Sequence, residues 1–103
     1  MRDTPPMDTD ATPARSITRH DDRGRYELAV DGDVVAFADF SPGDDMITIP
    51  YIETDLRHRG KGYSSILMDG VIDDLRARRL RVRATCPVAR AHVAARAHEL
   101  LVN

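Results

Sequence analysis

Arg57-His58-Arg59-Gly60-Lys61-Gly62 says more about this chain than any other six residues in it. The segment before it, 46–52, alternates like a strand, and the segment after it has the apolar spacing of a helix. The first N–H groups of a helix have no partner within the helix, and glycine lets a ligand approach the backbone closely. The six residues therefore predict a loop that binds phosphate or diphosphate at a helix N-terminus.

The stretch 57–62 matches neither the Walker A loop nor the dinucleotide-binding fingerprint. A single residue, Lys61, separates the two glycines and no Gly-Lys-Ser/Thr follows, which excludes a Walker A loop. The three-glycine dinucleotide fingerprint is absent as well. Arg57, Arg59 and Lys61 add positive charge, but taken alone the six residues are equally compatible with a glycine-rich turn whose charges are solvated.

The charge of the chain is divided unevenly along its 103 residues. Residues 1–56 carry 13 acids and 5 arginines, a formal charge of −8, whereas residues 57–103 carry 10 bases and 4 acids, a formal charge of +6. This division indicates either a negatively charged ligand held by the second half or simple attraction between the halves.

Three segments before the loop alternate polar and apolar residues as strands do. They are 25–30 (RYELAV), 34–40 (VVAFADF) and 46–52 (MITIPYI). Asp31-Gly32-Asp33 between the first two predicts a turn at hairpin spacing. Pro50 cannot donate a ladder hydrogen bond, so we expect pairing to break or bulge within the third strand.

The segments after the loop predict a helix, a strand and a second helix. Helical spacing runs from Tyr63 to about Arg78, and residues 80–85 (LRVRAT) alternate as a strand. Cys86-Pro87 ends that strand, because proline suits the first turn of a helix. Residues 89–101 then form the second helix. The apolar side chains expected on the buried face of the first helix are Leu67, Met68, Val71, Ile72 and Leu75.

The predicted order is therefore β-β-β-α-β-α, an α+β fold with a mixed sheet: an antiparallel meander followed by one β-α-β crossover. Residues 1–18 are rich in Pro, Thr and Asp and predict a disordered leader, and 19–103 form one small domain. A single cysteine predicts a reducing, cytoplasmic location and excludes multi-cysteine zinc sites. No apolar run is long enough to span a membrane.

The loop, with a strand before it and a long helix after it, resembles the acetyl-CoA pyrophosphate loop of the GNAT (GCN5-related N-acetyltransferase) superfamily. The chain resembles in particular its small single-domain members, the N-acetyltransferase domain-containing family. Residues 26–33 (YELAVDGD) are similar to that family's opening strand and turn, and residues 80–88 (LRVRATCPV) to its strand ending in Cys-Pro. The similarity runs from Arg25 to about Leu100.

The resemblance implies a minimal GNAT-like fold that binds acetyl-CoA as a cosubstrate and uses no metal. Strands 46–52 and 80–85 would splay apart and hold the pantetheine arm in the gap. The residues that this implies for CoA binding are Ile52, Arg57, His58, Arg59, Gly60, Lys61, Gly62, Tyr63, Ser64 and Ser65.

Acetyl transfer to an amine needs a proton acceptor, because an alkyl ammonium has a pKa of about 10.4. Glu53, at the end of the third strand, is the candidate base. In the similar family a cysteine at the position of Cys86 is suspected of carrying the acetyl group, although a lone cysteine is often only a small buried hydrophobe. The chain has Ile49 where the family tends to have histidine. It also has His92 where the family tends to have an aromatic residue, and His92 is the candidate proton donor to the thiolate.

The function expected from the sequence is N-acetyl transfer from acetyl-CoA to a small-molecule or protein amine. One alternative is a CoA-binding module without turnover. Another is a nucleic-acid binder that uses the basic run 76–83, which lacks interleaved aromatic residues and is the weaker alternative. A monomer or a weak homodimer is expected, with no membrane partner.

Overall fold

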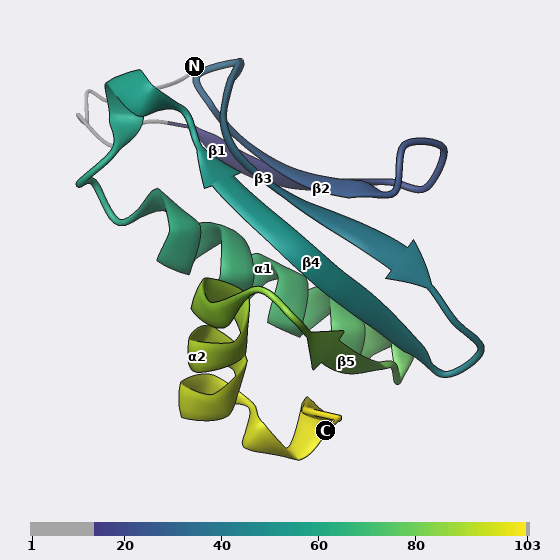
Figure 1. Cartoon of the computed structure of the whole chain (residues 1–103). Coiled ribbons are helices and arrows are strands. Elements are labelled where there is room, and N and C mark those ends of the chain that lie inside the picture. The colour runs from purple at the N-terminus through teal and green to yellow at the C-terminus, as the bar shows by residue number, and fades with distance from the viewer. Residues whose placement is uncertain (1–13, 103) are drawn as a thin grey trace, which may run out of the picture.

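A computed structural model describes residues 14–102 as one five-stranded sheet with two helices (Figure 1). The strands follow each other in chain order across the sheet: β1 (Arg15–His20), β2 (Arg25–Val30), β3 (Asp33–Pro42), β4 (Met46–Thr54) and β5 (Arg81–Ala84). The first four are antiparallel neighbours, and β5 pairs parallel with β4. The mixed sheet, the meander and the single crossover are thus confirmed.

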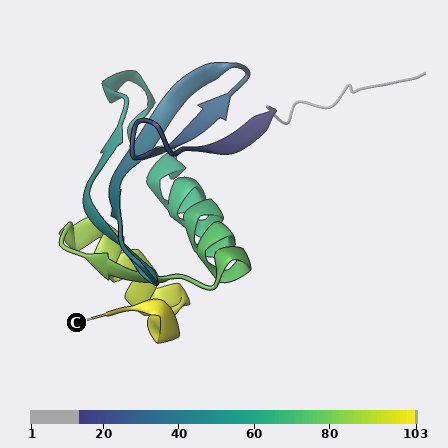
Figure 2. The ribbon, with the colours of Figure 1, turned by 90° about the vertical axis from the view of Figure 1, so that its right-hand side faces the viewer.

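Two α-helices follow β4. α1 (Tyr63–Arg78) joins β4 to β5 and packs on β2 and β3, whereas α2 (Pro87–Arg96) packs against α1, β4 and β5. Short 3₁₀ turns, η1 (Leu56–His58) and η2 (His98–Leu100), flank the helices. Figure 2 shows the strands curving over α1. Neither α-helix within residues 14–102 has the length and apolar character that crossing a membrane requires.

α1 has the predicted limits and the predicted buried face. All five apolar residues expected to face the core are buried. They pack against the inward side chains of the strands, among them Tyr26 and Leu28 of β2 and Ile47 and Ile49 of β4, in one continuous hydrophobic core. Alternating burial along β2 and β5 follows the period of two that a half-buried strand requires.

The turn between β2 and β3 also forms as predicted. Val30 pairs with Asp33, so Asp31 and Gly32 make a two-residue loop. Both have positive φ, 52° and 88°, which is the backbone of a type I′ hairpin turn.

The leader prediction is wrong at its end, because β1 begins at Arg15, inside the range 1–18. Residues 1–13 lie outside the described residues. β1 pairs with β2 along its whole length, and its central apolar residue, Ile17, packs on the core. Because only one of the six residues of β1 is apolar, the sequence shows no strand periodicity there. The strand forms because it pairs with β2. The structure thus adds a fourth strand before the loop.

The second helix is shorter than predicted. It ends at Arg96 rather than Leu101, because Ala97 takes φ −152° and turns the chain back toward the sheet. Leu101 then forms a parallel bridge with Val82, and the Val102 amide donates to the Val82 carbonyl at 2.8 Å. The C-terminal segment therefore covers the outer edge of β5 in place of further helix.

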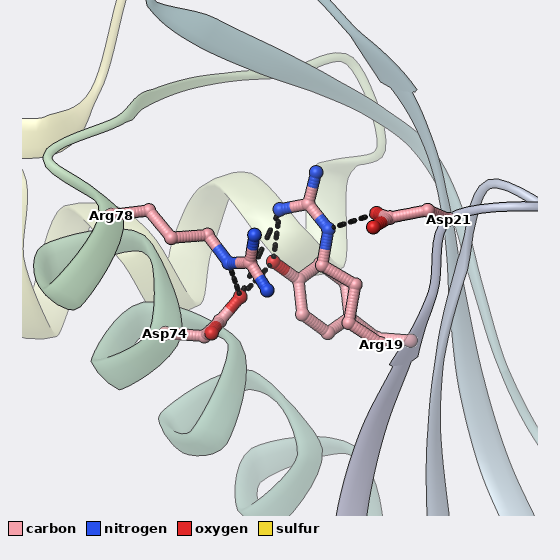
Figure 3. Close-up of polar contacts among 5 residues, drawn as sticks. Arg19, Asp21, Asp74 and Arg78 are labelled. Carbon is pink, nitrogen blue, oxygen red and sulfur yellow. Dashed lines mark hydrogen bonds and ion pairs between the residues drawn. The ribbon is translucent and has the colours of Figure 1, made fainter.

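A polar network ties β1, β2 and the end of α1 together (Figure 3). The buried Tyr26 hydroxyl donates to Asp74 at 2.6 Å and accepts from Arg19 at 3.0 Å. Arg78 donates to the same Asp74 oxygen at 2.8 Å, and Arg19 pairs with Asp21 at 2.6 Å. The phenol thus satisfies its polar atom at the rim of the core.

Gly70 lies in the middle of α1, directly beneath β1. A Cβ built on Gly70 would stand 2.0 Å from Cδ1 of Ile17 and 3.2 Å from its Cγ1. The glycine, which otherwise costs a helix about 1 kcal/mol, is therefore what allows β1 to lie close to α1.

We expect Gly70→Ala to lower the free energy of unfolding by about 1 kcal/mol despite the better helix propensity of alanine, because Ile17 must move. In an Ile17→Ala background the same change should raise stability, since only the helix propensity remains. Urea denaturation of the four proteins measures this reversal of sign. An increase in stability in both backgrounds would contradict the close approach.

Tyr26 should make stability fall at alkaline pH. Burial, together with the Asp74 hydrogen bond, raises the pKa of Tyr26 to about 12. Its stabilising contribution is complete below the unfolded pKa of about 10 and is lost as the pH rises through 12. We expect Tyr26→Phe to cost about 1–2 kcal/mol at pH 7 and to flatten this alkaline decline. Tyr63→Phe is the control, and an unchanged slope for Tyr26→Phe would refute the assignment.

Candidate functional site

The pairing between β4 and β5 ends next to Pro50, as predicted. The parallel pairing runs from Met46 to Ile49 and stops there. On the other side of β4 the register with β3 shifts, so that Ile49 and Pro50 together lie opposite Phe40. The amides of Thr85 and Cys86 both donate to the Ile49 carbonyl, at 3.1 and 3.3 Å. The two strands therefore separate immediately beyond that carbonyl.

Cys86 lies at this point of separation. It is the N-cap residue of α2, and Pro87 occupies the first turn as predicted. The residue is 9% exposed and packs with the core. A thiol at a helix N-terminus beside a gap between two strands is close to any group that enters the gap.

Asp55 and Arg57 fix the start of the loop after β4. The Asp55 carboxylate accepts from the Arg57 amide at 2.9 Å and pairs with its guanidinium at 3.2 Å. This contact lowers the pKa of Asp55 and raises that of Arg57. Arg59 donates to the Thr54 carbonyl at 3.4 Å. Arg57 and Arg59 are thus each bonded to a residue at the end of β4, and both stay exposed, as does Lys61.

Gly60 and Gly62 both have left-handed backbone, with φ of 82° and 76°. A Cβ on either would meet no atom of residues 14–102 within 4 Å, so the glycines are required by conformation and not by crowding. Gly62 is the N-cap of α1. No side chain within residues 14–102 caps this end, and the first turn carries no acid. The opening amides of Tyr63, Ser64 and Ser65 therefore present an uncompensated positive dipole.

His58 closes one side of the loop. Its ring lies 5.9 Å from the ring of Tyr63, and its Nδ1 is buried without a hydrogen-bond partner among the described residues. An unsatisfied buried nitrogen beside the opening of α1 adds one more polar atom to this end of the site.

His92 connects α2 to the first turn of α1. Its Nε2 lies 3.4 Å from the Ser65 hydroxyl, and its Nδ1 lies 2.8 Å from Nη1 of Arg96. Arg96 also pairs with Asp69 of α1 at 3.0 Å. Burial and then the charge of Arg96 lower the pKa of His92, against a smaller opposing effect of Asp69. The ring is therefore neutral at pH 7, which does not suit a proton donor to a thiolate.

A hollow of about 490 Å³ lies along one face of α2. Its lining is Pro87, Val88, Ala91 and His92. Val88 is 50% exposed. The hollow is therefore an apolar surface that continues from Cys86 to the imidazole beside Ser65.

Glu53 lies elsewhere. It pairs with Phe37 across β3 and β4, on the sheet face turned away from α1, and accepts a 2.5 Å hydrogen bond from Tyr51. It borders a second hollow of about 440 Å³, lined also by Glu27, Asp55 and Leu56 among others. The two hollows share no lining residue, so the structure does not bring Glu53 and His92 together.

Much of the positive charge in the second half of the chain is paired internally. Arg76 pairs with Glu99 at 2.8 Å, Arg78 with Asp74, and Arg96 with Asp69. Arg81 donates to the Leu101 carbonyl at 3.2 Å. Three of the five arginines in the basic run therefore have partners within the fold. Near the loop, Lys61 and Arg59, which contacts only a carbonyl, add to the positive end of the helix.

The sequence analysis did not identify the apolar lining of α2 or the role of Arg96. Residues 87, 88, 91 and 92 share a helix face by spacing, and Arg96 lies one turn after His92, so both signals were present in the sequence. The contact of His92 with Ser65 joins residues 27 apart and had no local signal.

Comparison with known proteins gives one family match and two similar structures. Residues 25–100 match the family model described as GCN5-related N-acetyl-transferase. A Staphylococcus aureus protein described as GCN5-like has a similar solution structure, with a TM-score of 0.57 and 16% identity, over 85% of this chain and 88% of that one. Ard1 from Thermoplasma volcanium has a TM-score of 0.51 and 28% identity, over 59% of this chain. The alignment spans only 43% of that protein. A search of curated proteins gives no match.

Proposed function

The chain belongs to the GCN5-related N-acetyltransferase family, and from this premise we propose that it transfers an acetyl group from acetyl-CoA to an amine of a small molecule or protein. The observation that carries the proposal is the start of α1: uncapped amides behind two left-handed glycines, next to the place where β4 and β5 separate. This combination fits a diphosphate whose attached arm enters the gap.

In the proposed complex the diphosphate is held by the loop 57–62 and by the amides of Tyr63, Ser64 and Ser65. The left-handed glycines turn the backbone without side chains in the way, and Lys61 supplies a mobile positive charge. Arg57 and Arg59 position the loop through Asp55 and Thr54. His58 packs near Tyr63 at one side of the loop.

The pantetheine arm then lies along β4 past Ile52 toward Pro50. Beyond Ile49 no strand among residues 14–102 pairs with this edge of β4, so its backbone groups can bond to the arm's amides. The apolar hollow on α2 covers the opposite side of the arm. The thioester would come to rest near Cys86, where the strands meet.

Transfer is proposed to use Cys86 as an acetyl carrier. The deprotonated thiol attacks the thioester carbonyl, the CoA thiolate leaves and takes up a proton, and the amine then attacks the cysteine thioester and restores the thiol. Backbone N–H groups at the start of α2 would stabilise the oxyanion. The proton that the amine loses returns to the Cys86 sulfur, and Glu53, which lies on the sheet face turned away from α1, is not assigned to this step.

Acetyl-CoA should raise the melting temperature of the protein, and the protein should release CoA from it when amines are added.

Gly60→Asp should weaken acetyl-CoA binding by about 100-fold, because a carboxylate then occupies the position of the phosphate. Gly60→Asn is the control, since asparagine has the same shape, tolerates positive φ and carries no charge. Calorimetry measures both variants. Equal loss of affinity in the two would contradict the placement of the diphosphate, and binding without CoA release would leave a CoA-binding module.

Cys86 should carry the acetyl group transiently. With acetyl-CoA and no amine, intact mass spectrometry of the wild-type protein should show an added acetyl group that amine removes. Cys86→Ala should lose this adduct and at least about 100-fold in kcat while keeping CoA affinity. Full turnover by Cys86→Ala would show direct transfer to the amine, with Cys86 serving only as packing.

A further inference from the structure

We propose that Arg96 is a positioning residue: through His92 it orients the Ser65 hydroxyl as a hydrogen-bond donor toward an anionic group at the first turn of α1. The inference rests on the proposed function, because the anion in question is the diphosphate of CoA. It is carried by a chain of contacts, Asp69–Arg96–His92–Ser65, that runs between the two helices.

The direction of each hydrogen bond in this chain follows from its chemistry. A guanidinium can only donate, so Nδ1 of His92, 2.8 Å from Arg96, must accept. A neutral imidazole with an accepting Nδ1 carries its hydrogen on Nε2, and Nε2 therefore donates to the Ser65 oxygen at 3.4 Å. The Ser65 hydrogen cannot point back at the ring and is directed elsewhere.

Ser65 is the third residue of α1, where the backbone amides converge on the expected anion. The Ser65 hydroxyl accepts a hydrogen bond from His92, which polarises it as a donor toward a phosphate oxygen at the first turn of α1. Asp69 of α1 in turn pairs with Arg96, which keeps the guanidinium against the ring.

The series of contacts Asp69–Arg96–His92–Ser65 also determines the charge of the His92 imidazole. The charged groups that act on His92 are Arg96 of its own helix and Asp69 of α1, and burial together with Arg96 favours the neutral ring. The sequence assigned His92 to proton donation. The geometry assigns it to transmitting a hydrogen bond from Arg96 to Ser65.

The hydrogen bonding of His92 can be tested without CoA. Nitrogen-15 NMR of the histidine rings in the full-length wild-type protein should show His92 protonated on Nε2 and unprotonated on Nδ1 at pH 7. Its titration should move upward in Arg96→Ala, where a like charge is lost. A His92 ring protonated on Nδ1 would overturn the proposed direction of the hydrogen bonds from Arg96 to His92 and from His92 to Ser65.

The effect on the ligand is tested by a double-mutant cycle with CoA itself. Ser65→Ala and Arg96→Ala should each weaken CoA binding about fivefold, and the double variant should be no weaker than Ser65→Ala, because Arg96 acts through that hydroxyl. Arg90→Ala, which removes the same charge from an exposed position on α2, is the control and should have less effect. Additive losses, or an equal loss in Arg90→Ala, would overturn the inference. Absence of CoA binding by the wild-type protein would instead refute the proposed function.

Discussion

The Ile49 carbonyl is the last backbone group of β4 that pairs with β5, and the opening between the two strands begins beyond it, next to Pro50 and the β-bulge opposite Phe40 of β3. Up to Ile49 the two strands pair in parallel; after it β4 continues to Thr54 on β3 alone. The Ile49 carbonyl receives the amides of Thr85 and Cys86 and so closes the ladder at one defined point. The proposed site is arranged around the Ile49 carbonyl. The Cys86 thiol lies where the two strands still pair, and the glycine loop follows the other end of β4.

The parts of this arrangement that the sequence predicted are those with local causes. Helical spacing from Tyr63 to Arg78, the Asp31-Gly32 turn and the effect of Pro50 each depend on neighbouring residues. The phosphate loop belongs to the same class, because two glycines before a helix are sufficient to predict the backbone there. These elements formed with the predicted limits to within one or two residues.

What the sequence did not predict depends on partners distant in the chain. β1 has one apolar side chain, Ile17, and exists because β2 offers an edge and Gly70 leaves room beneath it. α2 stops at Arg96 because Leu101 finds Val82 on β5. Helix propensity favoured continuing through Ala97, Glu99 and Leu100, and tertiary pairing outweighed it. The contact between His92 and Ser65 is of the same kind.

The two ends of α1 show how a domain of this size separates stability from binding. The start of the helix has Gly62 in place of a side-chain cap, which costs only about a few tenths of a kcal/mol. The end is secured by Arg79 in left-handed conformation and by Tyr26, Asp74 and Arg78 at the rim of the core. The amides left open at the start are those proposed to bind the diphosphate. The binding end can therefore stay unsatisfied in the free protein, because the buried apolar face of the helix and the network at its opposite end anchor it to the sheet.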